Sequence, residues 1–162
     1  MKKNKIKKVL ITLDYNQSAQ KVAEWGYEIA HSMDAEITIL HVVVDPIYYS
    51  DPAYSPIVGF SGHLASTPLI LDSMDGLKSV VQDFLDKIKH HLGDENIKTL
   101  IEHGDFSDSI LKTSIEMKAD MIIMGSHSQK WLEKIVMGSV SENVLKCTSI
   151  PILIIPTSNK SN

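Results

Sequence analysis

The sequence predicts an α/β protein with a mainly parallel sheet and right-handed crossovers, and three observations support this fold class. Short apolar runs alternate with segments of helical periodicity along the chain. Most of these runs are apolar throughout, which is typical of parallel strands covered on both faces. The 162 residues, of which 43% are hydrophobic and 22% charged, suit one globular domain over residues 1–162 and exclude a largely disordered chain.

Five short apolar runs are the candidate strands, and two of them have features of an edge strand. The third run mixes polar and apolar residues. Pro151 precedes the last run and has no amide to donate to a ladder, which favours an edge position there as well. In chain order the runs are residues 9–13, 37–44, 97–101, 121–124 and 152–155.

Four segments between the runs have the periodicity of amphipathic helices. We expect Ser18 to cap the first helix, Gly93 to end the second and Ser139 to begin the fourth. The apolar faces are Val22, Trp25, Ile29 and Met33 in the first helix; Leu77, Val80, Val81, Phe84, Leu85, Ile88 and Leu92 in the second; Ile110, Leu111, Ser114, Ile115 and Met117 in the third; and Val140, Val144 and Leu145 in the fourth.

Residues 45–72 interrupt this alternation, since the stretch holds four prolines, two glycines and three tyrosines. A loop of this length in a compact domain is usually a lid, a binding loop or a variable excursion. We favour a variable insertion, with a flap over the carboxyl end of the second strand as the alternative. Residues 1–6 and 157–162 are expected to be frayed tails.

The composition excludes several classes of function. The net charge of −4 gives no basic field for nucleic acid, and no apolar run approaches the roughly 20 residues of a membrane span. The single Cys147 excludes an internal disulfide and suits a cytoplasmic protein. All 16 basic residues are lysine, so an anion site must use main-chain amides, hydroxyls, helix ends or lysine charges rather than a guanidinium group.

Two turns rich in hydrogen-bond donors form the main candidate site. Glycine at the start of each turn allows a sharp bend or a close approach of a ligand to the main chain. Free amides at a helix N-terminus favour an anion, so the two turns would form a phosphate cradle at the carboxyl edge of a parallel sheet. The first turn reads Gly125-Ser126-His127-Ser128 after Met124, and the second reads Gly138-Ser139-Val140.

The same residues permit a purely structural interpretation. Ser139 and Glu142 have the spacing of a capping box, which would occupy the Ser139 hydroxyl within the helix. Glycines are also common between a strand and a helix without any ligand. The chain has neither a P-loop motif nor a G-x-G-x-x-G fingerprint, so the spacing alone slightly favours the structural interpretation.

Asp14 directly follows the first candidate strand. In a doubly wound sheet, ligands lie outside the carboxyl ends of the strands where the winding direction reverses. If strands one and four are neighbours there, Asp14 and Gly125 face the same crevice. Asp14 could then bind a ribose hydroxyl, an adenine amino group or a magnesium-bound water; its alternative role is to cap the first helix.

Histidine and cysteine give no sign of a metal or hydrolase site. The seven histidines form no zinc signature with Cys147, and no G-x-S-x-G motif occurs, so we assign no metal ligand. His41 lies within a strand run and is expected to be a hydrogen-bonded core residue. His127 lies in the first turn and could contact a phosphate.

Several stretches of the chain match a known family. They are residues 9–14 (VLITLD), 40–43 (LHVV), 119–126 (ADMIIMGS), 137–145 (MGSVSENVL) and 150–154 (IPILI). Through them the chain resembles the universal stress protein family over about residues 7–156. The resemblance implies a five-stranded parallel sheet in the order 3-2-1-4-5 with helices on both faces. It also implies a homodimer formed through the last strand, with Ile150 and Ile155 at its ends.

The ATP-binding branch of this family has the pattern glycine, two residues, glycine, nine residues, glycine and serine or threonine. The spacing is intact here, but Ser128 replaces the second glycine. The resemblance implies that Thr12, Asp14, Val42 and Met124 flank the adenosine of ATP, and that Gly125, Ser128, Gly138, Ser139 and Val140 surround the ribose and phosphates.

Ser128 has three possible effects on nucleotide binding. If the position needs a positive φ, serine costs about 1 kcal/mol relative to glycine, which weakens binding several-fold. If the glycine serves to admit a phosphate, the serine side chain would obstruct it. Alternatively, the serine hydroxyl could donate to that phosphate.

Three functions follow as hypotheses. The first is a stress-related regulatory protein that binds an adenine nucleotide, chiefly ATP with Mg²⁺ as a companion of the phosphates, and acts as a dimeric switch. The second is a universal stress protein that binds no nucleotide and recruits an unknown protein partner as a dimeric interaction module. The third, a slow ATPase or autophosphorylating enzyme, ranks last because the chain has no arginine and no evident general base; we assign no catalytic residue.

Overall fold

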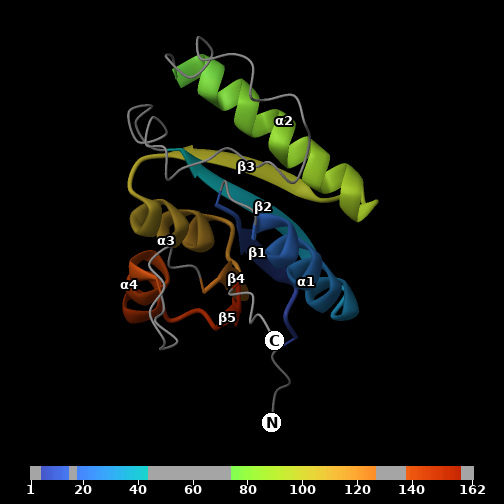
Figure 1. Ribbon diagram of the computed structural model, residues 1–162. Helices are drawn as coiled ribbons and strands as arrows, with labels where there is room; N and C mark the ends of the chain where they lie inside the picture. The colour runs from blue at the N-terminus through green and yellow to red at the C-terminus, as the bar shows by residue number, and fades with distance from the viewer. Residues whose placement is uncertain (1–4, 15–17, 44–73, 127–137, 158–162) are drawn as a thin grey trace, which may run out of the picture.

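The computed structural model describes residues 5–14, 18–43, 74–126 and 138–157. The described strands form one five-stranded parallel sheet in the order β3-β2-β1-β4-β5, which confirms the predicted fold class and strand order. The elements are β1 (Lys8–Thr12), α1 (Ala19–Ser32), β2 (Glu36–Val43), α2 (Met74–Leu92), β3 (Lys98–His103), α3 (Phe106–Glu116), β4 (Met121–Gly125), α4 (Ser139–Cys147) and β5 (Ile152–Ile155) (Figure 1).

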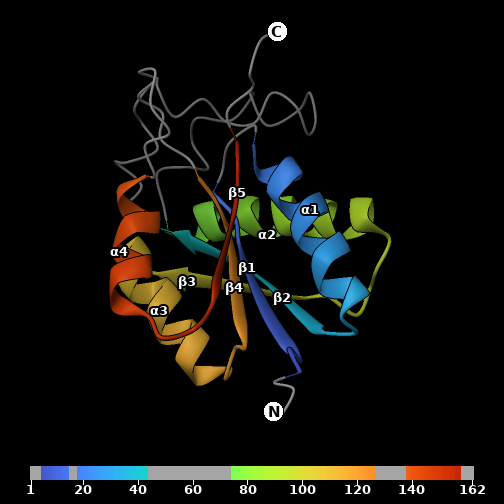
Figure 2. The ribbon, with the colours of Figure 1, turned by 90° about the horizontal axis from the view of Figure 1, so that it is seen from below.

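The helices cover both faces of the sheet. Helices α1 and α2 pack on one face, and α3 and α4 pack on the other (Figures 1 and 2). Each face of the sheet has its own hydrophobic core, and successive side chains of β1 point into the two cores in turn. Val9 and Ile11 belong to the core on the α1/α2 side, and Leu10 belongs to the core on the α3/α4 side. The winding direction therefore reverses between β1 and β4, which is the position where doubly wound sheets bind ligands.

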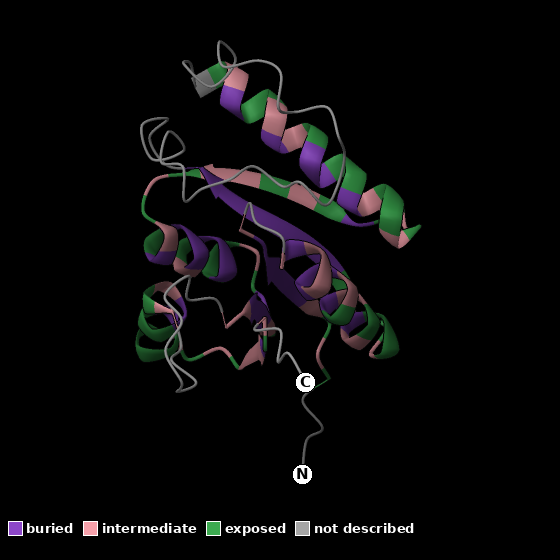
Figure 3. Ribbon diagram, viewed as in Figure 1, coloured by how far each residue is buried: buried purple, intermediate pink, exposed green. Residues whose placement is uncertain are grey.

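The edge positions of β3 and β5 are also confirmed. Figure 3 shows the central strands buried, whereas β3 carries exposed and intermediate residues along its length. Pro151 precedes β5, so its missing amide interrupts no ladder. The predicted loop at residues 45–72 lies outside the described residues.

The predicted apolar faces are buried or packed against the cores except at three residues, and small residues also contribute to the buried faces of α1 and α3. Trp25 is 56% exposed, and Ile115 and Leu145 are 71% and 51% exposed, so their predicted burial is wrong. Gly26 explains this for α1, because a Cβ there would lie 3.0 Å from Ile11 Cδ1 and the helix backbone must rest against β1. The buried residues are Ala19, Val22, Ala23, Gly26 and Ala30 in α1, and Ser107, Ser109, Ile110, Thr113 and Ser114 in α3.

Two helix ends test the capping predictions. Gly93 ends α2 with a φ of +69°, as predicted. Ser18 does occupy the N-cap position of α1, but its side chain makes no capping hydrogen bond. Its φ of −85° and ψ of −10° are helical rather than extended, which is not the geometry of a side-chain cap.

An aspartate joins the beginnings of β1 and β4. Asp120 Oδ2 accepts hydrogen bonds from the Lys7 and Lys8 amides at 2.8 and 2.9 Å. These two bonds hold the pKa of the Asp120 carboxyl below its ordinary value. The carboxylate thereby pins the two central strands together at their amino ends.

Candidate functional site

The candidate site lies at the carboxyl ends of β1 and β4. These neighbouring strands pair in register from Val9 opposite Met121 to Ile11 opposite Ile123. Thr12 ends β1 and Gly125 ends β4, so the segments that follow them leave the sheet side by side. The structure thus confirms that strands one and four are neighbours, which was the condition for Asp14 and Gly125 to share a crevice.

Helix α4 begins at the same edge (Figure 2). The Ser141 hydroxyl donates a hydrogen bond to the Gly125 carbonyl at 3.1 Å, which fixes the first turn of α4 against the end of β4. The first helical hydrogen bond runs from the Glu142 amide to the Gly138 carbonyl. The amides of the three residues 139–141 precede that bond and have no acceptor within the helix, so they form the positive end of its dipole.

The predicted capping box at the start of α4 is wrong. Gly138, not Ser139, occupies the N-cap, and the helix has no side-chain cap. Glu142 instead bonds Lys146 at 2.7 Å, one turn further along, and this bond lowers the pKa of the Glu142 carboxyl. Gly138 has φ −61° and ψ 153°, a conformation open to any residue. Glycine is therefore not required at this position by the backbone conformation, and what it contributes is the lack of a side chain beside the helix amides.

Ser126, one of the predicted site residues, is hydrogen-bonded to the end of β5 and to the residues that follow it. Its amide donates to the Ile155 carbonyl at 2.9 Å, and its hydroxyl accepts from the Thr157 amide at 3.1 Å. These bonds extend the pairing of β4 and β5 beyond their last residues. The Ser126 amide is used inside the protein, so a phosphate at this edge needs other donors.

The predicted adenosine neighbours differ in exposure. Thr12, Val42 and Met124 are buried, with exposed fractions of 8%, 4% and 4%. Asp14 and Gly125 are half-buried. Val42 and Met124 both belong to the core on the α3/α4 side, so the floor of this edge is apolar and rigid. His127 and Ser128 lie outside the described residues.

The structure adds His41 to this edge. Its Nδ1 lies 2.8 Å from the Leu13 carbonyl oxygen, and its ring packs edge-on against Phe84 with 6.2 Å between centroids. The expectation of a hydrogen-bonded core histidine is confirmed. Sequence reasoning missed that its partner is the residue before Asp14, although a histidine within an apolar strand is a signal that a polar partner lies nearby.

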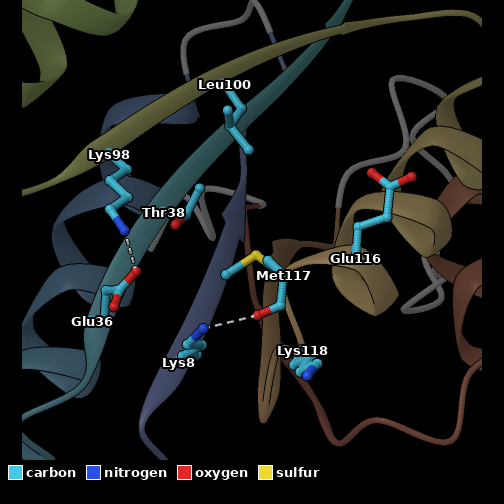
Figure 4. A pocket seen from close by; sticks show the side chains of 8 residues that line it. All are labelled: Lys8, Glu36, Thr38, Lys98, Leu100, Glu116, Met117 and Lys118. Atoms are coloured by element: carbon cyan, nitrogen blue, oxygen red, sulfur yellow. Dashed lines mark hydrogen bonds and ion pairs between the residues drawn. The ribbon is translucent and has the colours of Figure 1, made fainter.

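A second concavity lies at the opposite edge, at the amino ends of β1, β2 and β3. It is an open groove of about 320 Å³ between the sheet and the end of α3 (Figure 4). Three of its charged side chains bond within the protein: Lys98 pairs with Glu36, and Lys8 Nζ donates to the Met117 carbonyl at 3.3 Å. These pairings and its position at the amino edge make the groove a poorer ligand site than the carboxyl edge.

Among residues 5–14, 18–43, 74–126 and 138–157, no group of three or more His, Cys, Asp or Glu side chains could hold a metal ion. In the same part of the chain, no helix is long and apolar enough to cross a membrane.

The fold defines a doubly wound α/β protein whose winding direction reverses between β1 and β4, the position at which sheets of this kind bind ligands. Residues 5–156 match the model of the Universal stress protein family, so the chain belongs to that family. The Universal stress protein MJ0577 of Methanocaldococcus jannaschii is 27% identical over 156 residues, which cover 94% of this chain and 96% of the relative.

Solved structures of this kind share the fold. The structure of MJ0577 superposes with a TM-score of 0.68 at 24% identity, over 96% of this chain and 99% of that chain. A universal stress protein in complex with cAMP gives 0.62 at 19% identity, over 96% and 100%. A universal stress protein from Archaeoglobus fulgidus in complex with dAMP gives 0.59 at 14% identity, over 93% and 98%.

Proposed function

We propose that this universal stress protein is a regulatory protein that binds an adenine nucleotide, with ATP as the leading candidate, at the carboxyl edge of the sheet. The observation that carries the proposal is the start of α4. Its three leading amides have no acceptor within the helix, Gly138 at the N-cap offers no side chain to cap them, and the Ser141–Gly125 hydrogen bond holds them at the switch point. Such an arrangement favours an anion of phosphate type.

Two relatives support the choice of an adenine nucleotide. Universal stress proteins of the same fold were solved in complex with cAMP and with dAMP. Both ligands combine an adenine with a phosphate, which matches an apolar floor beside a helix N-terminus. The choice of a triphosphate, with Mg²⁺ bound to it, rests on the family motif and not on these complexes.

The proposed contacts divide between the two ends of the nucleotide. Asp14 binds the sugar or the adenine amino group, beside Thr12, Val42 and Met124. Helix α4 supplies the main-chain donors to the phosphates. The residues proposed around the ribose and phosphates are Gly125, Ser126, His127, Ser128, Gly138, Ser139 and Val140.

A homodimer through β5 completes the proposal. The strand is an edge of the sheet, and its residues Ile152, Leu153 and Ile154 are only half-buried in one copy of the chain. Nucleotide would shift the conformational equilibrium of such a dimer by its differential affinity for the two states. We expect the dimer to act in the cytoplasm on a protein partner yet to be identified.

The second candidate is a dimeric interaction module that binds no nucleotide. The Ser126 amide and hydroxyl favour it, because both are engaged with the end of β5. A slow ATPase ranks third, since the chain has no arginine to stabilise a transferring phosphoryl group.

Two experiments separate these candidates. Protein purified from cells is denatured and its supernatant is searched for adenine nucleotide by mass spectrometry. ATP binding is then measured by calorimetry, with and without Mg²⁺, for the wild type, Gly138→Val and Ser128→Gly. We expect Gly138→Val to weaken binding by blocking the amides, and Ser128→Gly to bind equally or more tightly.

The outcomes that contradict the proposal are concrete. Absence of binding at millimolar ATP would favour the interaction module. Phosphate release above a buffer blank that disappears in Asp14→Ala would revive the enzyme. Gly138→Val tests space rather than backbone strain, because its φ of −61° suits any residue.

A further inference from the structure

The residue that follows β1, Leu13, is hydrogen-bonded by a side chain of the neighbouring strand β2. Strands β1 and β2 pair with Thr12 opposite Leu40, and the Leu13 amide extends the ladder by donating to the Leu40 carbonyl at 2.9 Å. In a regular parallel ladder, the next hydrogen bond would run from the main-chain amide of Val42 to the Leu13 carbonyl. Here the imidazole of His41 bonds that carbonyl instead, with 2.8 Å between Nδ1 and the Leu13 oxygen.

The direction of this hydrogen bond is determined by its acceptor. A carbonyl oxygen only accepts, so Nδ1 carries the proton and donates. His41 and Leu13 are 2% and 4% exposed, so water does not compete for the bond. Burial lowers the pKa of His41 to about 4 against the opposing effect of the bond to Leu13, so the ring is neutral at pH 7. The edge-on contact with Phe84 further restricts its orientation.

The bond joins two segments of the proposed site. Leu13 directly precedes Asp14, and His41 directly precedes Val42. The position of the Leu13 carbonyl sets where the chain leaves the sheet, and therefore where Asp14 begins. Side chains that must meet a ligand bind it more tightly when their backbone is fixed in advance.

We propose that His41 is a positioning residue of the nucleotide site, which holds the Leu13 carbonyl and thereby fixes Asp14 at the crevice. The inference rests on the proposed function, because it assigns a task to His41 in that same site. His41 contacts no nucleotide itself. It acts through Leu13 on the ligand-binding aspartate.

The test compares two substitutions that differ in one donor. His41→Asn places an amide N–H near the position of Nδ1, whereas His41→Leu fills the core without a donor. In calorimetric titrations with ATP, we expect His41→Leu to weaken binding about tenfold and His41→Asn to stay within about threefold of the wild type. Thr113→Val is the control, since it changes a buried polar side chain of α3 and should leave the Kd unchanged.

A double-mutant cycle separates positioning from a general loss of structure. Asp14→Asn is mild enough to keep binding measurable. If His41 acts through Asp14, His41→Leu costs clearly less in the Asp14→Asn background than in the wild type. Equal losses in both backgrounds would overturn the inference. All titrations are done well below the unfolding midpoint of every variant.

The remaining outcomes are distinguishable. If the wild type binds ATP and His41→Leu binds it equally well, the positioning role is wrong and the proposed function stands. If His41→Asn loses as much affinity as His41→Leu, the donor is not what matters and the inference is overturned. If the wild type binds no ATP, the proposed function fails and this inference fails with it.

Discussion

Helices α3 and α4 begin at the same edge of the sheet, yet their first turns are built differently. The N-cap of α3 is Asp105, whose carboxylate accepts a hydrogen bond from the Asp108 amide at 3.0 Å. The N-cap of α4 is Gly138, which offers no side chain to its helix. Among the described residues, a side chain therefore caps the positive end of α3 and none caps that of α4, which is the arrangement that the proposed phosphate site requires.

The far end of α3 is closed by the chain as well. The Lys118 and Ala119 amides donate back to the Ile115 and Ser114 carbonyls at 3.0 and 2.9 Å, which is a Schellman motif. Asp120 then pins the beginning of β4 to β1. Helix α3 is thus closed by hydrogen bonds at both ends, in contrast to α4, whose N-cap residue supplies no side chain.

The largest effect is expected when α4 is given the cap of α3. In Gly138→Asp, the new carboxylate would occupy the leading amides of α4 and repel phosphate, so we expect ATP affinity to fall about 100-fold or more. The same change should raise the unfolding free energy by a few tenths of a kcal/mol, about the gain from Gly to Asp at an N-cap. Calorimetry and thermal unfolding measure the two effects on one sample.

A neutral variant is the matched control for Gly138→Asp. Gly138→Asn has nearly the same size and capping geometry without the charge, so it should weaken ATP binding less. Undiminished ATP binding by both variants would show that phosphate is not held at the start of α4, and the comparison between the two helices would lose its functional meaning.

Asp120→Ala should have the largest effect on stability. It removes a charged acceptor from two main-chain amides, and with a discount for exposure to solvent we expect a loss of about 1–2 kcal/mol in unfolding free energy. ATP affinity should not change, because Asp120 lies at the opposite edge from Gly138. Urea unfolding measures the loss, and Asp120→Asn, which keeps one oxygen acceptor, should recover part of it.

The pH dependence of that loss has a definite sign. The folded pKa of Asp120 is depressed by the Lys7 and Lys8 amides. Its contribution is therefore fully present above the unfolded pKa of about 3.9 and is lost as pH falls through the lower folded pKa. The stability difference between wild type and Asp120→Ala should be flat from neutral pH downward and shrink below about pH 4. A difference that grows on acidification would contradict the assigned hydrogen bonds.

Asp105→Ala tests α3, the helix whose N-terminus is capped by a side chain. It opens the N-terminus of α3 and should cost about 1 kcal/mol of stability, the usual cost of losing an N-cap side chain. ATP affinity should stay at the wild-type value. Asp105→Asn should keep most of the stability, since its side-chain oxygen can accept the same hydrogen bond. A loss of ATP affinity in Asp105→Ala would extend the nucleotide site to α3.

The sequence predicted the strands well because their apolar runs follow directly from burial on both faces. It failed where the outcome depends on how closely elements approach. The exposed Trp25 reflects Gly26 packed against Ile11, and periodicity carries no information about that distance. The strand order came from the family resemblance rather than from the residues.

The sequence placed Gly125 at the end of a strand and Gly138 before a helix, as the structure shows, but it did not reveal the hydrogen bonds around them. The predicted capping box failed because Gly138 takes the cap one residue earlier. The hydrogen bond from His41 to Leu13 spans 28 residues and has no local spacing to signal it. Hydrogen bonds between distant segments depend on strand register, which a single sequence does not reveal.

The smallest effect is expected at the exit from α3. Lys118 adopts a φ of +55°, a left-handed conformation that glycine tolerates and lysine disfavours. Lys118→Gly should therefore stabilise the protein by about 0.5–1 kcal/mol, reduced by the entropy that glycine adds to the unfolded chain. Lys118→Ala removes the charge but keeps the strain, so it should give no gain. An equal gain in unfolding free energy in the alanine and glycine variants would assign the effect to the lost charge rather than to the backbone. The positive φ of Lys118 would then not be a source of strain at the end of α3.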